Sequence, residues 1–241
     1  MSSPLLDVQH VTKRFGGFQA LTDVSLQVHE GERVGLIGPN GSGKTTLINC
    51  IAGLLQTDGG RIRFRGTDIT TRPAHQRTRL GIARTFQIPK PFTSMTVLGN
   101  LCVPLTYVRA GQRHASDIAS EAMAILQRID LGGKAHVTVS SLTLIELRKL
   151  ELARAMAARP LLLIADEALA GLSGVEVDEL LDILARLNDE GITMIMIEHI
   201  MRAVMRFSSR IVVLDAGQTI ADGTPAETMR HSAVEKAYLG T

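Results

Sequence analysis

The sequence contains no tryptophan, and aromatic residues make up only 3% of its 241 residues. Proteins that bind single-stranded nucleic acids stack the bases on aromatic side chains, so this scarcity argues against that class. The charge is nearly balanced, with 26 basic and 24 acidic residues and a formal net charge of +2. Non-specific binding to a phosphate backbone needs a strong positive excess. We therefore expect no nucleic acid among the partners of this chain.

Cysteines and long apolar runs are also scarce. The two cysteines, Cys50 and Cys102, stand alone and fit no metal-ligand spacing, which indicates reduced core thiols in a cytosolic protein. No stretch approaches 18 uncharged apolar residues, and the first 15 residues lack the pattern of a signal peptide. We therefore expect no membrane span. Hydrophobic residues still make up 45% of the chain, which indicates a buried α/β core and leaves room for an apolar partner surface.

Short apolar runs alternate with helical patterns at both ends of the chain. The expected strands are 5–8, 24–28, 34–37, 61–64, 82–86, 161–165, 193–197 and 211–214. The expected helices include 176–188 and 201–207, and the middle of the chain reads as helical. The run at 161–165 is entirely apolar, as in a central strand of a parallel sheet.

These patterns predict an α/β fold class with a single domain spanning 1–241. We expect a P-loop nucleotide-binding core with a mostly parallel sheet, formed by 1–94 and 159–241. A helical subdomain is expected as an insertion at 95–158.

Residues 38–45 read GPNGSGKT and match the motif G-x-x-x-x-G-K-[ST] between an expected strand and a helical pattern. Its glycines let consecutive backbone N–H groups curve around a phosphate, and the helix N-terminus adds a partial positive charge. Lys44 is expected to neutralise the β- and γ-phosphates, and the Thr45 hydroxyl is expected to hold Mg²⁺. The expected phosphate-binding residues are Gly38, Pro39, Asn40, Gly41, Ser42, Gly43, Lys44, Thr45 and Thr46. An unrelated glycine-rich turn is the alternative, and the flanking strand and helix argue against it.

Acidic and polar residues follow three other apolar strands. Asp166 ends the run LLLIAD and suits a water-mediated contact to Mg²⁺, while Glu167 suits the general base that polarises the attacking water. Gln87 follows the run at 82–86 and could reach Mg²⁺ or that water. His199 follows the strand at 193–197 and could contact the γ-phosphate. In isolation an Asp-Glu pair can be a solvated loop, and a single His is more often structural. Their combination with the phosphate loop favours a nucleoside triphosphate site.

The order of these motifs resembles that of the ATP-binding subunits of ABC transporters, over residues 5–240. The finer resemblance is to the importer group for branched-chain (hydrophobic) amino acids. It rests on GIARTFQ at 81–87, MTVLGNL at 95–101, IEHIM at 197–201 and AYLG at 237–240. The resemblance also implies that Phe15, in KRFGG, stacks on adenine, and that an antiparallel β subdomain stands at the N-terminus.

The same resemblance implies how such a subunit works. Two ATP-binding subunits would form a head-to-tail dimer, in which ATP and Mg²⁺ lie between one phosphate loop and the signature helix of the other subunit. This dimer would dock under two transmembrane permease subunits at the cytoplasmic face of the membrane, as a peripheral protein. A periplasmic or extracellular solute-binding protein would take part indirectly. The helical insertion and the segment after Gln87, IPKPFTSMTV, would form the groove for the permease, although that segment also reads as a plain loop.

The signature segment departs from the family pattern Leu-Ser-Gly-Gly-Gln. The aligned residues here are LTLIE at 142–146, so both glycines and the glutamine are replaced. Thr143 and Glu146 have the spacing of a capping box, and Leu142 and Leu147 stand at the positions of a hydrophobic staple. This helix end is expected to satisfy its own donors instead of offering them to ATP. Two alternatives stay open: the backbone N–H groups still reach a phosphate, with Thr143 as a nucleotide contact, or the alignment is shifted.

A second departure is Ser173, where the family usually has Asp after Leu in the loop that follows Asp-Glu. Together these changes predict a heterodimer with one competent and one impaired ATP site, although a homodimer is possible. The function expected is ATP hydrolysis that powers an importer of branched-chain amino acids or related small solutes. The alternatives are an accessory nucleotide-binding subunit with little turnover and a soluble ABC ATPase outside transport. A P-loop GTPase is disfavoured because no Asn-Lys-x-Asp motif is present.

Overall fold

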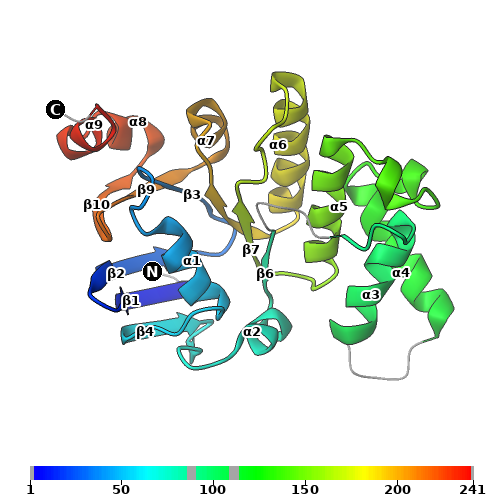
Figure 1. Cartoon of the computed structure of the whole chain (residues 1–241), viewed down its shortest axis with the longest axis horizontal. Coiled ribbons are helices and arrows are strands. Elements are labelled where there is room, and N and C mark those ends of the chain that lie inside the picture. Colours follow the sequence, from blue (N-terminus) through cyan, green and yellow to red (C-terminus); the bar gives the residue numbers. More distant parts are fainter. Residues whose placement is uncertain (1–2, 86–90, 109–113, 240–241) are drawn as a thin grey trace.

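The computed structural model describes residues 3–85, 91–108 and 114–239 of the chain (Figure 1). Its central sheet has the strand order β10-β9-β3-β8-β7-β6. The bounds of these strands are β3 Arg33–Ile37, β6 Ile82–Arg84, β7 Leu162–Asp166, β8 Thr193–Ile197, β9 Arg210–Asp215 and β10 Gln218–Gly223. All neighbouring pairs are parallel except β9 and β10. The prediction of a mostly parallel sheet is therefore confirmed.

A second, antiparallel sheet lies beside the first and has the order β2-β1-β4-β5. Its strands are β1 Leu6–Phe15, β2 Phe18–Val28, β4 Gly59–Phe64 and β5 Thr67–Asp68. The N-terminal antiparallel unit is thus confirmed, but β1 is longer than the predicted strand at 5–8. Its apolar alternation breaks between Val8 and Val11, where the register shifts and His10 has a φ of 51°. A β-bulge of this kind hides the continuation of a strand from a search for period two.

Helices cover both faces of the central sheet (Figure 1). Their bounds are α1 Lys44–Ala52, α2 Ala74–Leu80, α3 Val97–Val108, α4 Ala115–Arg128, α5 Leu144–Met156, α6 Gly174–Asp189, α7 Met201–Phe207, α8 Pro225–Met229 and α9 Ser232–Leu239. Two short 3₁₀ turns, Gly132–Lys134 and Val139–Ser141, lead into α5. Helices α3, α4 and α5 fill the middle of the chain, and the subdomain boundaries at 95 and 158 stay a prediction.

The core has two large parts because successive residues of each buried strand face opposite sides of the sheet. In β7, Leu162 and Ile164 belong to a cluster shared with α1 and the antiparallel sheet. Leu163 and Ala165 belong to the other cluster, which includes residues of α3, α4, α5 and α6. The sheet is therefore buried on both faces, and its strand ends are fixed relative to the helices around them.

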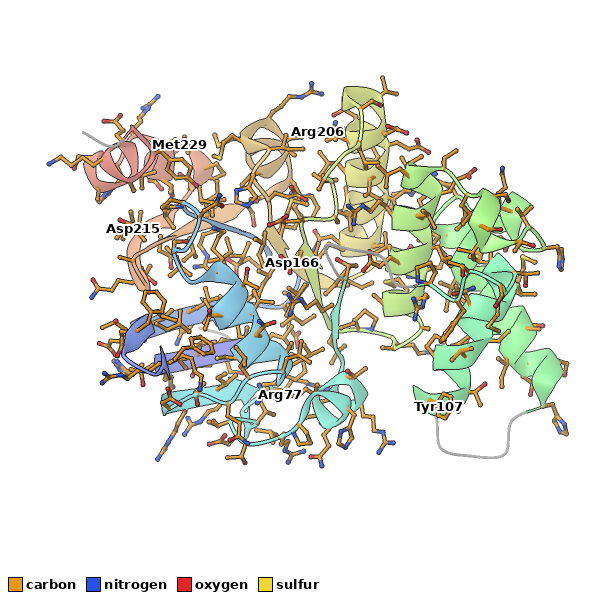
Figure 2. All side chains as sticks on the ribbon, in the orientation of Figure 1. Arg77, Tyr107, Asp166, Arg206, Asp215 and Met229 are labelled. Atoms are coloured by element: carbon orange, nitrogen blue, oxygen red, sulfur yellow. The ribbon has the colours of Figure 1, made fainter. Side chains whose placement is uncertain are left out.

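Arg77 ties α2 to the end of α1 and was not foreseen from the sequence. Its guanidinium is fully buried and donates to the carbonyl oxygens of Cys50 (2.7 Å) and Ile51 (2.9 Å), in the last turn of α1 (Figure 2). A cation is favourable there because the helix dipole places negative charge at the C-terminus. This contact anchors the helix whose other end meets the phosphate loop.

No helix within residues 3–85, 91–108 and 114–239 combines the length and the apolar character that a membrane crossing requires.

Candidate nucleotide-binding site

The loop at 38–43 joins β3 to α1 and depends on glycine at both of its ends. Gly38 has a φ of +150°, and a Cβ there would lie 2.0 Å from the carbonyl oxygen of Leu214. Gly43 precedes α1 with a φ of +104°, and a Cβ there would lie 2.8 Å from the carbonyl oxygen of Ala20. Side chains are excluded at both positions by backbone atoms and by the positive φ. The loop can therefore turn tightly over the start of α1.

Lys44 is the first residue of α1, and its side chain folds back over the loop. Its Nζ donates to the carbonyl oxygens of Gly38 (2.8 Å) and Pro39 (2.9 Å), and the residue is buried. Burial lowers the pKa of Lys44 because it disfavours the charged form, while the nearby carboxylates of Glu167 and Asp166 oppose this shift. The ammonium group thus stands at the mouth of the loop with two acids close by.

The two acids come from the carboxyl end of β7, and a histidine comes from the end of β8. Asp166 is the last residue of β7 and is buried in the middle of the molecule (Figure 2). Glu167 follows with a φ of +47°, and its N–H donates to the carbonyl oxygen of Ile197 (2.9 Å). The Nε2 atom of His199 lies 3.3 Å from Oε1 of Glu167. Parallel neighbours β7 and β8 end at the same edge, which brings these predicted residues together.

Arg84 belongs to the same group, although no local sequence pattern points to it. Its Nη2 donates to Oδ2 of Asp166 at 2.5 Å, and its Nη1 donates to Asn49 on α1. Both members of the ion pair are nearly buried, with side-chain exposures of 10% and 7%. Asp166 is therefore held in place by a charge-assisted hydrogen bond from β6.

A hollow of about 240 Å³ gathers most of the predicted residues. It is lined by Phe15, Phe18, Ala20, Asn40, Gly41, Ser42, Gly43, Lys44, Thr45, Thr46, Glu167 and His199. Phe15 and Phe18 face each other across the β1–β2 turn and remain exposed by 47% and 62%. Phe18 was missed in the sequence, where a second aromatic beside the turn Gly16-Gly17 was the available signal. The hollow therefore has a polar end at the phosphate loop and an aromatic end at this turn.

Comparison with known proteins identifies the family to which this arrangement belongs. A family model described as ABC transporter matches residues 21–170. The chain belongs to the ABC transporter family. Nucleotide binding, and ATP hydrolysis coupled to transport, are the general activities of that family.

Individual relatives agree over the full length of the chain. The high-affinity branched-chain amino acid transport ATP-binding protein BraF of Pseudomonas aeruginosa is 40% identical over 253 aligned positions, which cover 100% of this chain and 99% of BraF. A crystal structure of the ADP conformation of MJ1267, an ATP-binding cassette of an ABC transporter, has a TM-score of 0.90 and 31% identity and covers 100% of both chains. A dimeric post-hydrolysis state of the cassette MJ0796, bound to ADP and Pi, has a TM-score of 0.81 and 25% identity over 91% of this chain and 98% of that one. The resemblance to the branched-chain group is confirmed.

The start of α5 departs from the signature pattern of this ABC family, and the structure confirms the predicted capping box. The N–H of Thr143 donates to Oε2 of Glu146 (2.9 Å), and the N–H of Glu146 donates to Oγ1 of Thr143 (3.4 Å). Lys134 lies 3.2 Å from the other carboxylate oxygen of Glu146. The hydrogen bond from Thr143, followed by Lys134, lowers the pKa of Glu146. The carboxylate of Glu146 therefore stays anionic in the first turn of α5.

The loop that follows Glu167 contains a second self-contained cap. Ser173 starts α6 with its own capping box, in which its N–H donates to Glu176 (2.8 Å) and its hydroxyl accepts from the N–H of Glu176 (3.4 Å). The side chain of Leu144 lies against the same loop, beside Gly171. A Cβ built on Gly171 would lie 3.1 Å from the Cδ2 atom of Leu144. The signature segment therefore lies beside the loop that leads to Ser173.

Four of the predicted site residues that the structure describes do not line the hollow: Gly38, Pro39, Asp166 and Thr143. Thr143 does not line it, and lies at the exposed start of α5. Gln87 lies outside the described residues, as do the first residues of the segment that follows it.

Glu198 is a buried carboxylate beside the hollow, and it makes stability depend on pH. Burial raises its pKa from 4.5 to about 7, and the charge of Glu167 adds to this shift. A raised acid pKa means that the folded chain favours the protonated form, so stability is lost as pH rises from about 4.5 through 7.

Glu198→Gln removes this ionisation. Between pH 5 and pH 8 we expect the stability of the variant, relative to the unchanged chain, to rise by about 2 kcal/mol. Urea unfolding of the purified chain at both pH values measures the difference. A constant difference would contradict the raised pKa.

Proposed function

We propose that this chain binds ATP in the hollow at 38–46 and hydrolyses it to drive an importer. The observation that carries the proposal is that one hollow brings together the phosphate loop, Glu167 and His199. Lys44 and the loop N–H groups would hold the phosphates. Glu167 would accept the proton of the attacking water, and His199 would orient Glu167 and contact the γ-phosphate. Phe15 would stack on the adenine ring, with Phe18 beside it.

Mg²⁺ fits this site as a metal that binds together with the phosphates. Within the described residues, no group of three or more His, Cys, Asp or Glu side chains could hold a metal ion by itself. Mg²⁺ usually takes one or two protein oxygens and completes its shell with phosphate and water. Thr45 supplies a hydroxyl in the hollow, Asp166 supplies a carboxylate fixed by Arg84, and Gln87 is the further ligand that we propose. Bound there, Mg²⁺ would neutralise phosphate charge.

The transport role is supported by a second cavity, which is lined in part by Arg84. This cavity of about 430 Å³ is lined by Ala52, Leu54, Ala74, Thr78, Ile82, Ala83, Arg84, Pro104, Glu151, Arg154, Ala155 and Ala158. It lies between the nucleotide-binding core and the helices at 95–158, which we propose as the helical subdomain. Its lining is mostly apolar and includes Leu54, an exposed large hydrophobic residue. We propose that two permease subunits dock at such cavities, which would place the protein at the cytoplasmic face of the membrane.

The substrate class follows from the relatives. BraF is a branched-chain amino acid transport protein by name, so branched-chain amino acids or related small solutes are the proposed cargo. A solute-binding protein would deliver the cargo to the permease without touching this chain.

The dimer partner we propose is a second, different ATP-binding subunit with a glycine-containing signature. The self-capped start of α5 supports this, because the N–H groups of Thr143 and Glu146 are each engaged by the side chain of the other residue. In such a mixed dimer, the phosphate loop of this chain would meet a normal signature, and the other composite site would be impaired. The same cap favours a second candidate, an accessory subunit with little turnover, and a homodimer is the alternative assembly.

ATP turnover by the purified chain, alone and mixed with its paired subunit and permease, tests the proposal. We expect turnover by the mixture to exceed that of the chain alone by about 10-fold or more, since two charge-assisted bonds are missing when the self-capped end faces ATP. The complex should also co-elute with the detergent-solubilised permease. Equal turnover by the chain alone would exclude the impaired site, and failure to co-elute would favour a soluble ATPase.

A further inference from the structure

Glu198 has no part in the proposed chemistry, yet it lies between Glu167 and His199, the two residues that carry out that chemistry. It follows β8 directly, precedes His199, and is only 3% exposed. Its Oε1 accepts the N–H of Leu169 at 2.8 Å, and its carboxylate also accepts the N–H of His199. One buried side chain therefore contacts the backbone on both sides of the Glu167–His199 pair.

The loop that starts at Glu167 needs contacts of this kind. Glu167 has a φ of +47°, a conformation that residues with a Cβ rarely adopt. Such a conformation persists only where the surroundings determine it. Within the loop, the N–H of Ala170 donates to the carbonyl oxygen of Glu167 at 3.3 Å. The N–H of Glu167 is held by Ile197. The weak bond from Ala170 makes the other side of the turn depend on what holds Leu169 and Ala170.

Arg148 holds the same loop by its next carbonyl group. It is buried on α5, two residues after Glu146, and its Nη2 donates to the carbonyl oxygen of Ala170 at 3.0 Å. A buried carboxyl group just after β8 thus accepts the N–H of Leu169, and a cationic side chain from α5 binds the carbonyl oxygen of Ala170. The signature helix and the catalytic loop are joined at one short stretch of backbone.

We propose that Glu198 is a positioning residue that, with Arg148, clamps residues 169–170 and so keeps Glu167 and His199 in their hydrolytic arrangement. This inference rests on the proposed function, because it concerns the turnover of ATP at that site. Because Arg148 belongs to α5, a movement of α5 would shift the carbonyl oxygen of Ala170. The loop would pass this shift on to Glu167. The phosphate loop is not part of the clamp, so nucleotide affinity does not depend on it.

Three substitutions of Glu198 separate the effect of side-chain length from the effect of charge. Glu198→Gln keeps an oxygen that can accept the N–H of Leu169 but has no charge. Glu198→Asp keeps the charge but is one methylene shorter, and Glu198→Ala has neither feature. A matched control is Glu32→Gln, which alters a carboxylate bound to Arg210 at the far end of β3.

In the mixed dimer with permease, we expect Glu198→Asp and Glu198→Ala to lower the kcat for ATP by about tenfold or more, because small misplacements of a catalytic group are costly. The Kd for ATP, measured on each purified chain, should stay within about threefold of the unchanged protein, because a group outside the phosphate contacts alters turnover and not ground-state binding. In the same assay, Glu198→Gln and Glu32→Gln should keep kcat within about threefold of the unchanged protein.

Each outcome of these measurements either supports or overturns the positioning role of Glu198. The positioning role is overturned if Glu198→Ala and Glu198→Asp keep full kcat, or if kcat and Kd change together. It is also overturned if both variants fail to fold while Glu198→Gln folds, since Glu198 would then be a determinant of the fold alone. If the unchanged complex has no ATP turnover, the proposed function fails first.

Discussion

Glu167→Gln should abolish nearly all ATP turnover by the mixed dimer. A general base contributes about 10²- to 10⁴-fold, and the amide cannot accept the proton of water. Glutamine is isosteric, so the loop conformation at a φ of +47° and the phosphate contacts of Lys44 should persist. We therefore expect the Kd for ATP, from equilibrium binding to the purified chain, to change less than about threefold because the substitution spares the phosphate contacts.

A control substitution separates this effect from a general loss of charge. Glu190→Gln alters an exposed carboxylate that pairs with Arg128 and directly follows the C-terminus of α6. Its turnover should match that of the unchanged mixed dimer. If Glu167→Gln retained half of the turnover, two equivalent sites would be working, and the asymmetry proposed for the dimer would be wrong.

Restoring the family signature should produce the largest gain of function. The substitutions are Leu144→Gly, Ile145→Gly and Glu146→Gln, made in a chain that also carries Glu167→Gln. Turnover by the mixed dimer then comes only from the site that uses the signature of this chain. We expect that turnover to rise by about 10- to 100-fold, since two bulky side chains and a negative charge are removed where the backbone N–H groups can form one or two charge-assisted bonds to phosphate.

The same substitutions should weaken the start of α5. Thr143 and a glutamine at position 146 can still form the capping box, but each glycine within a helix costs about 0.5–1 kcal/mol. The ion pair between Lys134 and Glu146 is lost as well. Thermal unfolding should therefore shift down while turnover rises. The matched control is Glu227→Gln at the capping box of Thr224 on α8, which should lower stability slightly and leave turnover unchanged. No gain from the restored signature would show that the self-capped end does not limit that site.

Local patterns were sufficient for much of the fold and for the phosphate loop. The apolar runs at 161–165 and 193–197 correspond to β7 and β8, and the residues that follow them reach one edge because parallel neighbours end together. The capping box at 143–146 was predictable because all of its contacts lie within one helical turn. Ser173 and Glu176 have the same capping-box spacing in the sequence. The comparison with the family pattern noted only that Ser173 replaces the usual aspartate.

Contacts between distant segments could not be predicted in this way. The ion pair of Arg84 with Asp166 joins residues 82 positions apart, and no periodicity encodes it. Glu198 extends an apolar strand and gives no sign that its carboxylate turns inward to Leu169. The burial of Arg77 has the same cause, because two of its partners, Cys50 and Ile51, belong to another helix. These residues position the site, and the packing of separate elements determines where they lie.

Two mirrored mixed dimers test the proposed asymmetry most directly. One carries Glu167→Gln in this chain, and the other carries the equivalent substitution in the paired subunit. Steady-state ATP turnover is measured for both beside the unchanged dimer. We predict that the first dimer loses nearly all turnover and that the second keeps most of it, because the self-capped start of α5 impairs the site of the paired subunit. Equal losses in the two dimers would contradict this prediction.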